Sequence, residues 1–418
     1  MKHSPLNKLT LVALFSTVFL TACGDNAATK SEPKANAMSH VEQAETIAKN
    51  TLIIDTHIDV PYRLDHKYED VSHATQEGDF DYPRAVKGGL NAPFMSIYIP
   101  AKLQKTGGSK ALADKLIDDV EIIVKQSPDK FALAYSTAQV KENFTKGIIS
   151  LPMGMENGSA IEGDLANLQH FYQRGIRYIT LAHSKTNHIS DSSYDENKPA
   201  QGLTDFGKKL IVEMNNTGVM VDISHVSDQA FYQVMEISKV PAIASHSSAR
   251  HFTPGFERNM SDDMIKLLAK NGGVIQMTFS GIFTSQKFRE QSAAYKIAKD
   301  KFIKENNLNE ELEADEAKID AFEEVYEKNT PYDVGTLALV LDHFEHVINL
   351  VGIDHVGIGS DFDGVSGILP ETLKDVASYP NLIAGLLERG YSEAEIEKLL
   401  SGNIMRVWQQ VEEYAAKH

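Results

Sequence analysis

The sequence contains a single cysteine, Cys23, among its 418 residues. One thiol cannot form an intrachain disulfide, and it cannot build a thiolate metal centre. Disulfide-stabilised scaffolds and zinc fingers are therefore excluded, and stability must come from a buried apolar core. A chain of this length can bury one large α/β domain or two to three smaller ones.

Basic residues are scarce relative to acidic ones. The sequence has 41 Lys and Arg against 58 Asp and Glu, which gives a formal net charge of −17. Nucleic-acid backbones and anionic lipid surfaces both attract clustered Lys and Arg. We therefore expect no nucleic-acid partner.

The N-terminal segment is typical of an export signal. Lys2 and Lys8 precede an apolar run over residues 11–20, which is too short to be a comfortable membrane span. The run leads into Leu20-Thr21-Ala22-Cys23, which resembles a bacterial lipobox, where the signal peptide is cut before the cysteine and the cysteine is then lipidated. We interpret 1–22 as a lipoprotein signal peptide, Cys23 as the lipidation site and 23–40 as a flexible tether.

Lipidation would anchor the protein to a membrane without a spanning helix. Gly24 stands where an Asp would retain a lipoprotein at the inner membrane, so we expect an exported, periplasm-facing lipoprotein at the outer membrane. The alternative is an ordinary secretory signal with an incidental cysteine.

From residue 41 onward, short apolar runs alternate with amphipathic stretches, the pattern of repeated βα units around a parallel sheet. We predict eight strands: Leu52–Asp59, Ala92–Ile99, Ile148–Glu156, Ile176–His183, Val219–His225, Pro241–His246, Gly273–Phe279 and His355–Asp361. Helices are predicted between most of them, as over 111–125, 203–216, 228–237 and 261–270. Eight such units indicate that residues 41–418 form one α/β domain, a (β/α)8 TIM barrel. A doubly wound open sheet is the alternative, but no Gly-x-Gly-x-x-Gly turn follows the first strand.

Two further regions are not part of the eight βα units that a minimal barrel requires. Residues 288–329 are dense in Lys and Glu and are predicted to be a charged helical insertion between strands seven and eight, with a role as a lid as an alternative. Residues 373–389, 393–400 and 403–414 are apolar at helical spacing, and we expect these extra C-terminal helices to pack around the outside of the barrel.

Ionisable residues end six of the eight predicted strands. His57 and Asp59 lie two positions apart on the first strand and therefore point to the same side. The other strand ends supply Glu156, His183, His225, His246 and Asp361. Barrel enzymes carry their chemistry at the carboxyl ends of the strands, so we expect these side chains to meet at one rim.

A rim of four imidazoles and three carboxylates is costly for a protein under selection for stability alone, because crowded ionisable groups must be desolvated or repel one another. A bound divalent metal offsets that cost, and zinc accepts both imidazole and carboxylate ligands. The strand ends therefore predict a metal site.

The motifs that carry these residues resemble those of the membrane dipeptidases, also called renal dipeptidases. They occur in the family's order and are His57-x-Asp59, Glu156-Asn-Gly, Ser224-His225, Ser245-His246-Ser-Ser, Arg258-Asn-Met-Ser-Asp262-Asp263 and Gly359-Ser-Asp361-Phe-Asp-Gly. The resemblance implies two zinc ions per chain, with His57 and Asp59 on one, His225 and His246 on the other, and Glu156 bridging both. It also implies substrate roles for His183, Arg258 and Asp361.

The implied reaction is hydrolysis of a dipeptide, including one with a C-terminal D-residue, by a hydroxide shared between the two zinc ions. In that reaction Asp361 would move the proton, His183 would stabilise the tetrahedral oxyanion, and Arg258 would bind the substrate's free carboxylate. Family members are often dimers, so a homodimer is an expectation from the resemblance alone.

Several assignments near the rim have alternatives. Arg250 is nearer to His246 in the sequence and could replace Arg258 as the carboxylate clamp. We interpret Asp55 as a partner that orients a metal ligand, and Asp363 as a turn or cap residue. No role is assigned to the remaining histidines.

Two other functions compete with the dipeptidase interpretation. A related barrel amidohydrolase would act on lactones, phosphotriesters or N-acyl amino acids. Many such sites bridge their metals with a carbamylated lysine, whereas here the third strand ends in Glu156 and the nearest lysine, Lys146, precedes the strand. A scaffold lipoprotein without activity would be expected to lack ligands, and none is missing.

Overall fold

The computed structural model describes residues 38–309 and 312–418. The predicted signal peptide, Cys23 and the tether up to residue 37 lie outside the described residues. The first helix, α1 (His40–Asn50), begins with a capping box: the Ser39 hydroxyl accepts from the Glu42 N–H, and the Glu42 carboxylate accepts from the Ser39 N–H.

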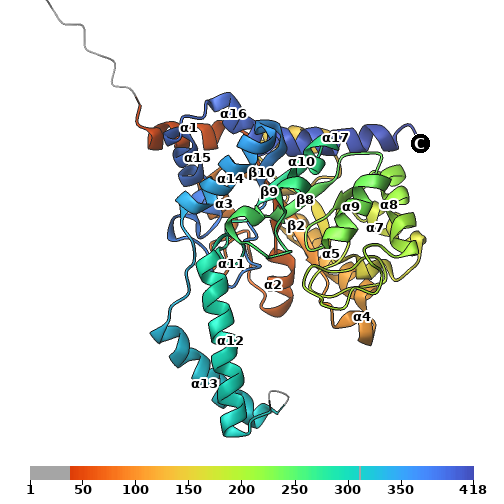
Figure 1. Cartoon of the computed structure of the whole chain (residues 1–418). Coiled ribbons are helices and arrows are strands. Elements are labelled where there is room, and N and C mark those ends of the chain that lie inside the picture. The colour runs from red at the N-terminus through yellow and green to blue at the C-terminus, as the bar shows by residue number, and fades with distance from the viewer. Residues whose placement is uncertain (1–37, 310–311) are drawn as a thin grey trace, which may run out of the picture. The chain divides into compact units, whose positions relative to one another are not determined.

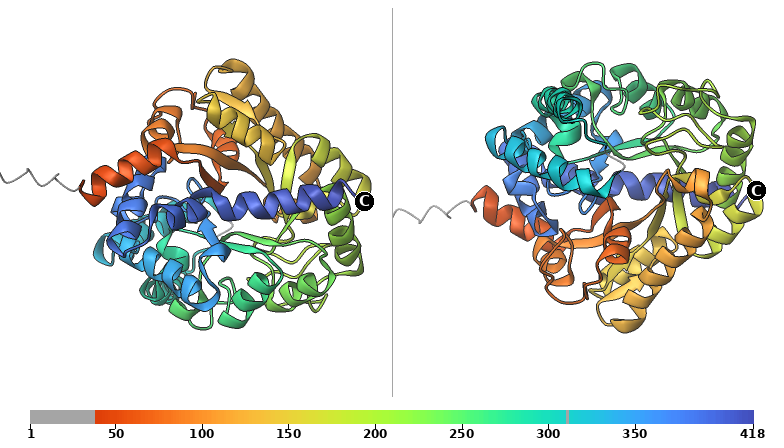
Figure 2. Two further views of the ribbon diagram at one scale, coloured as in Figure 1. Left: turned by 90° about the horizontal axis from the view of Figure 1, so that it is seen from above. Right: turned by 90° about the horizontal axis from the view of Figure 1, so that it is seen from below.

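Eight parallel strands form the central sheet, in the order β1-β2-β5-β6-β7-β8-β9-β10. They are β1 (Ile53–Ile58), β2 (Leu90–Tyr98), β5 (Met153–Glu156), β6 (Ile176–Thr180), β7 (Met220–Asp222), β8 (Ile243–Ser247), β9 (Val274–Met277) and β10 (Val356–Ile358). Figure 2 shows the strands enclosed by a ring of helices. The sheet closes between β1 and the residues after β10, because the Asp59 N–H donates to the Phe362 carbonyl at 2.9 Å and the Asp361 N–H to the His57 carbonyl at 3.2 Å. The predicted (β/α)8 TIM barrel is confirmed.

The helices follow the predicted alternation (Figure 1). Those before β9 are α2 (Val60–His66), α3 (Tyr82–Gly88), α4 (Leu103–Thr106), α5 (Ser109–Gln126), α6 (Thr137–Thr145), α7 (Leu165–Gln173), α8 (Asp205–Thr217), α9 (Asp228–Ile237) and α10 (Asp262–Lys270). Those after β9 are α11 (Gly281–Thr284), α12 (Gln286–Asn306), α13 (Glu313–Asn329), α14 (Leu337–Val351), α15 (Tyr379–Glu388), α16 (Glu393–Glu397) and α17 (Asn403–Ala415). Single turns of 3₁₀-helix include η2 (Arg250–Phe252), and Lys398–Gly402 is a π-helical turn.

The predicted single strand over 148–156 is wrong in one respect, because it is broken at Pro152. Residues before the proline form β4 (Ile149–Leu151), which pairs with β3 (Phe131–Leu133) in a separate two-stranded sheet. Residues after it form β5 within the barrel. Proline has no N–H to donate to a ladder, and here its carbonyl accepts from the Met95 N–H at 2.8 Å.

The charged insertion between β9 and β10 is helical, as predicted. Figure 1 shows α12 and α13 as a hairpin that projects away from the barrel. Aromatic pairs hold the two helices together, with ring centroids 4.5 Å apart for Phe302 and Phe322 and 5.3 Å apart for Tyr295 and Tyr326. No described residue of this hairpin lines the pocket at the strand ends, although Arg289 of α12 lies 3.4 Å from the centroid of the Phe256 ring, and the alternative role of a lid stays a hypothesis.

The last helix departs from the expectation that all C-terminal helices pack around the outside. Figure 2 shows α17 crossing one end of the barrel. Its Trp408 is fully buried, 5.2 Å from the ring of Phe94 on β2, and joins an inner core with Tyr178 of β6. The hydrophobic face of α17 therefore closes the amino-terminal end of the barrel, opposite the predicted site.

Across residues 38–309 and 312–418, no helix combines the length and the apolarity that crossing a lipid bilayer requires.

Replacing Trp408 by Ala tests the closing role of α17. The cavity left in the inner core should lower the free energy of unfolding by about 3–5 kcal/mol, measured by chemical denaturation followed by circular dichroism. The neighbouring Gln409→Ala is the matched control, because Gln409 is exposed on the same helix and its loss should be nearly neutral. Equal stability of the two variants would show that α17 does not close the barrel.

Candidate active site

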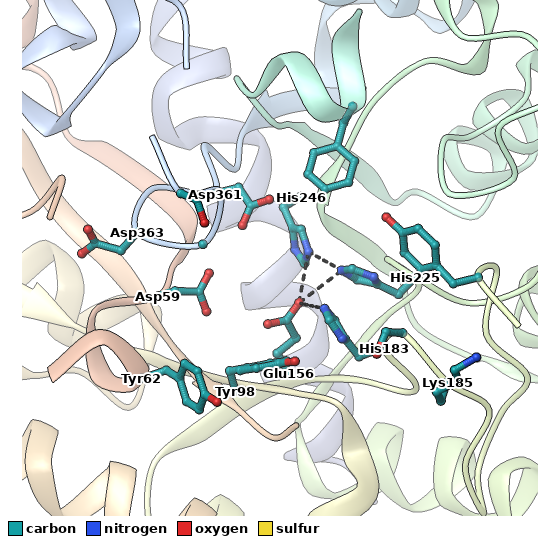
Figure 3. Close-up of a pocket in the computed structure, with 15 residues that line it drawn as sticks. Asp59, Tyr62, Tyr98, Glu156, His183, Lys185, His225, His246, Asp361 and Asp363 are labelled. Carbon is teal, nitrogen blue, oxygen red and sulfur yellow. Dashed lines mark hydrogen bonds and ion pairs between the residues drawn. The ribbon is translucent and has the colours of Figure 1, made fainter. Parts of the chain in front are cut away.

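The seven ionisable residues predicted to end strands all lie together at the carboxyl end of the barrel, and Figure 3 labels all of them except His57. β1 positions His57 and Asp59, and β5 positions Glu156. His183, His225 and Asp361 follow β6, β7 and β10 respectively, and His246 lies within β8. His183 is partly exposed, and the other six are buried.

Glu156 lies at the centre of this cluster. Its Oε1 is 3.5 Å from His183 Nε2, 3.2 Å from His225 Nε2 and 3.3 Å from His246 Nε2. Its Oε2 lies 3.5 Å from His57 Nε2, which is in turn 3.4 Å from Asp59 Oδ2. The Glu156 carboxylate thus faces the His57–Asp59 pair with Oε2, and it faces the imidazoles of His183, His225 and His246 with Oε1.

The donor atoms fit bound divalent cations. His225 Nε2 and His246 Nε2 are 2.7 Å apart, and two neutral imidazole nitrogens this close have no stable arrangement unless they share a proton or a cation. The buried Nε2 of His57 has no hydrogen-bond partner. Three overlapping groups each bring three ligand atoms within 4.8 Å of one another: His57, Asp59 and Glu156; Glu156, His183 and His225; and His57, His246 and Asp361.

Tyr178 fixes the orientation of the first-strand imidazole. Its hydroxyl donates to the Thr56 carbonyl at 3.0 Å and lies 2.9 Å from His57 Nδ1. The hydroxyl therefore accepts from a protonated Nδ1, which leaves the lone pair of Nε2 facing Glu156. Gly154 makes room for this contact, since a Cβ there would overlap the Tyr178 ring.

Asp222, at the end of β7, fixes His246 in a similar way. Its carboxylate accepts from the Ser245 hydroxyl at 2.6 Å, and that hydroxyl lies 2.8 Å from His246 Nδ1. A Ser245 hydroxyl that donates to Asp222 accepts from Nδ1, so Nε2 of His246 again faces the centre. Sequence patterns did not single out Tyr178 or Asp222, because each acts through a contact with a residue of another strand.

The charges at Glu156, His225 and His246 favour metal binding. Burial would raise the pKa of Glu156, but His57 and His183 outweigh it and hold that pKa well below its ordinary value. Burial lowers the pKa of His225 and of His246 well below the usual range, reinforced by Arg258 for the first and by His57 for the second. An ionised carboxylate and neutral imidazoles are the forms that bind metals.

Two of the rim residues are held in an unusual backbone conformation. His225 and Asp361 both have φ of 68°, in the left-handed region that non-glycine residues seldom adopt. Burial raises the pKa of Asp361 to about 7, against the opposing effect of His57 and with reinforcement from Asp59 and Glu156. Gly364 packs against this carboxylate, and a Cβ there would overlap both Asp59 and Asp361.

Arg258 and Arg250 differ clearly in their surroundings. Arg258 is buried beside the cluster, with Nη2 3.1 Å from His225 Nε2 and 2.6 Å from the His246 carbonyl. Arg250 instead donates from Nη1 and Nη2 to the Asp228 carboxylate at 2.8 and 2.5 Å, away from the pocket. The guanidinium near the cluster is therefore that of Arg258.

Asp55 and Asp363 both support the backbone around the site. Asp55 accepts from the N–H groups of His57 and Ser360, each at 3.0 Å, and so ties β1 to the end of β10. It was expected to orient a metal ligand, and these contacts reach the backbone of His57 and not its side chain. Asp363 has φ of 65°, which agrees with its interpretation as a turn residue, and its carboxylate accepts from Arg63 Nε at 3.0 Å.

A pocket of about 570 Å³ opens above the cluster, within the range of about 300–1,000 Å³ common for small-molecule sites. Its lining includes Asp59, Glu156, His183 and Asp361 from the rim (Figure 3). Sequence patterns did not single out its other walls, which include Tyr98 at the end of β2 and, from loops and helices, Tyr62, Lys185, Tyr194 and Phe283.

Comparisons with known proteins agree with this geometry. Residues 41–418 match the family model described as membrane dipeptidase, peptidase family M19. The chain is 31% identical over 386 residues to Dipeptidase 3 of Rattus norvegicus and, equally, of Mus musculus, a match that covers 90% of this chain and 68% of each relative.

Solved structures share the fold. A probable dipeptidase, PvdM from Pseudomonas aeruginosa, is 26% identical with a TM-score of 0.79, and the match covers 90% of this chain and 99% of that one. A metallo peptidase from Rhodobacter sphaeroides, liganded with a phosphinate mimic of the dipeptide L-Ala-D-Ala, is 23% identical with a TM-score of 0.69, covering 87% and 99% of the two chains.

With its strand-end cluster in place, and with the family match extending over the whole barrel, the chain belongs to the membrane dipeptidase family, peptidase family M19.

Proposed function

We propose that this protein hydrolyses the amide bond of dipeptides, including those with a C-terminal D-residue, with the help of two zinc ions. The observation that carries the proposal is the position of Glu156, whose two oxygens face two different sets of ligands. A bridging carboxylate between two such sets is what a pair of cations requires.

The residues that would hold the cations divide between these two sets. His57 and Asp59 would hold one ion, His225 and His246 the other, and Glu156 would bridge both. When bound, a zinc pair lowers the pKa of a shared water and polarises the scissile carbonyl.

Asp361 and His183 then remain for proton transfer and charge stabilisation. The Asp361 carboxyl lines the pocket beside His57 and His246, so it can accept a proton from water and return it to the leaving amine. The His183 side chain is 20% exposed, against 1% for His246, and lines the pocket, so it can reach an oxyanion formed on the substrate.

The charges around the pocket suit a dipeptide zwitterion. Asp59, Asp361 and Asp363 lie on one side, where a free amino group would be attracted, whereas Lys185 lies toward the imidazole side (Figure 3). The buried Arg258 lies beside His225. The planar guanidinium of Arg258 is suited to the substrate carboxylate, and the contacts of Arg250 with Asp228 disfavour that alternative.

The competing functions have less support. A barrel amidohydrolase for lactones, phosphotriesters or N-acyl amino acids would use the same rim, but membership of a dipeptidase family and a glutamate in the bridging position favour dipeptides. A scaffold without activity would not need all seven residues within one cluster.

The proposal extends to location. A chain with the lipobox-like Leu20-Thr21-Ala22-Cys23 would be lipidated at Cys23 and would face the periplasm from the outer membrane, held by that anchor alone. A homodimer is part of the same proposal, on family resemblance.

A substrate panel tests the reaction. Purified protein should cleave L,L and L,D dipeptides, lose that activity on dialysis against a chelator, and regain it with two equivalents of Zn²⁺ per chain, measured by amine release and metal analysis. Turnover of a lactone or phosphotriester without any dipeptide would support the amidohydrolase instead. Less than one tightly held zinc per chain would support the scaffold.

Replacing Asp361 by Asn tests its assignment to proton transfer. The amide cannot exchange the proton, so kcat should fall by about 10²–10⁴-fold while the zinc content stays nearly unchanged. His246→Ala removes a proposed ligand and serves as the contrasting control. This variant should lose both turnover and bound zinc. A matching loss of zinc in Asp361→Asn would make Asp361 a ligand.

Replacing Arg258 by Ala tests the carboxylate clamp. Losing a charge-assisted hydrogen-bond donor should lower kcat/KM for dipeptides by about 10- to 100-fold and affect C-terminally amidated analogues much less. Arg250→Ala is the matched control and should show no such difference between the two substrate classes. An even loss across both classes in Arg258→Ala, with metal content preserved, would place the clamp elsewhere.

A further inference from the structure

A second group of metal-binding side chains lies outside the pocket. His251 of η2, Asp262 at the start of α10 and His346 of α14 bring three ligand atoms within 4.8 Å of one another. His346 Nε2 is 2.7 Å from Asp262 Oδ1, and the His251 and His346 rings stack with centroids 4.3 Å apart. None of the three lines the pocket at the strand ends.

The second imidazole distinguishes this group from an ordinary surface ion pair. His73 and Asp70 form such a pair, with Nδ1 2.9 Å from Oδ2, and they belong to no group of three ligand atoms. At the second group, His251 adds another imidazole within reach of the same point. Asp262 lies in the first turn of α10.

The spacing is compatible with a tetrahedral ion. Zinc lies about 2.0–2.1 Å from nitrogen and oxygen ligands, so its tetrahedral ligands are about 3.3 Å apart. Asp262 Oδ1 and His346 Nε2, 2.7 Å apart, would move slightly apart to take an ion in place of the proton they share. His251 is exposed and stacks on His346, so a rotation of its side chain toward solvent would complete the set.

We propose that His251, Asp262 and His346 form a third cation site, one that binds Zn²⁺ or another borderline divalent ion such as Ni²⁺ or Cu²⁺. Two imidazoles and one carboxylate are the ligands such ions prefer, with water in the remaining position. Mg²⁺ and Ca²⁺ prefer oxygen ligands and would not compete.

An ion at this site would connect η2 and α10, which both lie between β8 and β9, to α14, which lies between β9 and β10. The segment between η2 and α10 contains Arg258, and it is already tied together because the Arg250 N–H donates to the Met260 carbonyl at 2.8 Å. The ion would fasten this segment to α14 and stabilise the fold from outside the catalytic pocket.

The experiment begins with protein that carries its full catalytic metal complement. Equilibrium dialysis against Zn²⁺ should give one more bound ion per chain in the wild type than in His346→Ala or His251→Ala. Asp262→Asn keeps the helix start and should weaken binding at this site at least tenfold. The matched control, His73→Ala, removes a histidine from a pair without a third ligand and should bind as much Zn²⁺ as the wild type.

Thermal unfolding provides a second measurement that does not depend on activity. The Tm of the wild type should rise with the logarithm of free Zn²⁺ and stay unchanged with Mg²⁺, whereas the Tm of His346→Ala should not respond to either. Equal zinc content in the wild type and in both histidine variants would overturn the proposal, as would an equal loss in His73→Ala. Dipeptide hydrolysis plays no part in these measurements, so their failure would leave the proposed reaction untouched.

Discussion

The structure depends on one buried carboxylate, that of Glu156, which has four imidazoles within 3.5 Å. A charge withdrawn from water must be compensated by partners held in fixed positions. The imidazoles come from four different strands, separated by up to about half of the chain. A closed parallel barrel brings all these strand ends to one mouth, and the backbone bonds between β1 and the residues after β10 complete it by placing His57 beside Asp361. The same backbone bonds therefore complete both the barrel and the site.

The orientation of the imidazoles is set from inside the barrel. Trp408 of α17 packs against Phe94, whose ring is 5.5 Å from that of Tyr178, and the Tyr178 hydroxyl fixes His57. A helix at the amino-terminal end is thus connected through packed aromatic rings to the site at the opposite end. Because interiors are close-packed, a shift of α17 would be transmitted to the ring that holds the tautomer of His57.

The sequence was sufficient to predict the barrel and the seven rim residues because both follow from local order. Apolar runs mark buried parallel strands, and a His, Asp or Glu at the end of such a run must emerge at the carboxyl rim. Tyr178 and Asp222 were not predicted, since each acts by a side-chain contact that forms only when distant strands become neighbours. The position of α17 has the same cause: its amphipathic pattern predicts a buried face, but periodicity does not say which surface of the barrel receives it. Pro152 stands in the middle of the apolar run over 148–156, and proline is disfavoured inside a central strand, so the sequence does contain a local signal for this break.

The rim also contains strain that only the assembled fold can hold. His225 and Asp361 occupy left-handed backbone positions, at a cost of about 1–3 kcal/mol each for residues other than glycine. Asp55 and Asp363 secure the surrounding backbone, the first by accepting from the N–H groups of both His57 and Ser360, the second through Arg63. The Asp55 carboxylate accepts from the His57 N–H and from the N–H of Ser360, the residue before Asp361, so one buried group holds the backbone at both places. Carboxylates outside the ligand set therefore contribute to the geometry, because they hold the backbone from which functional side chains project.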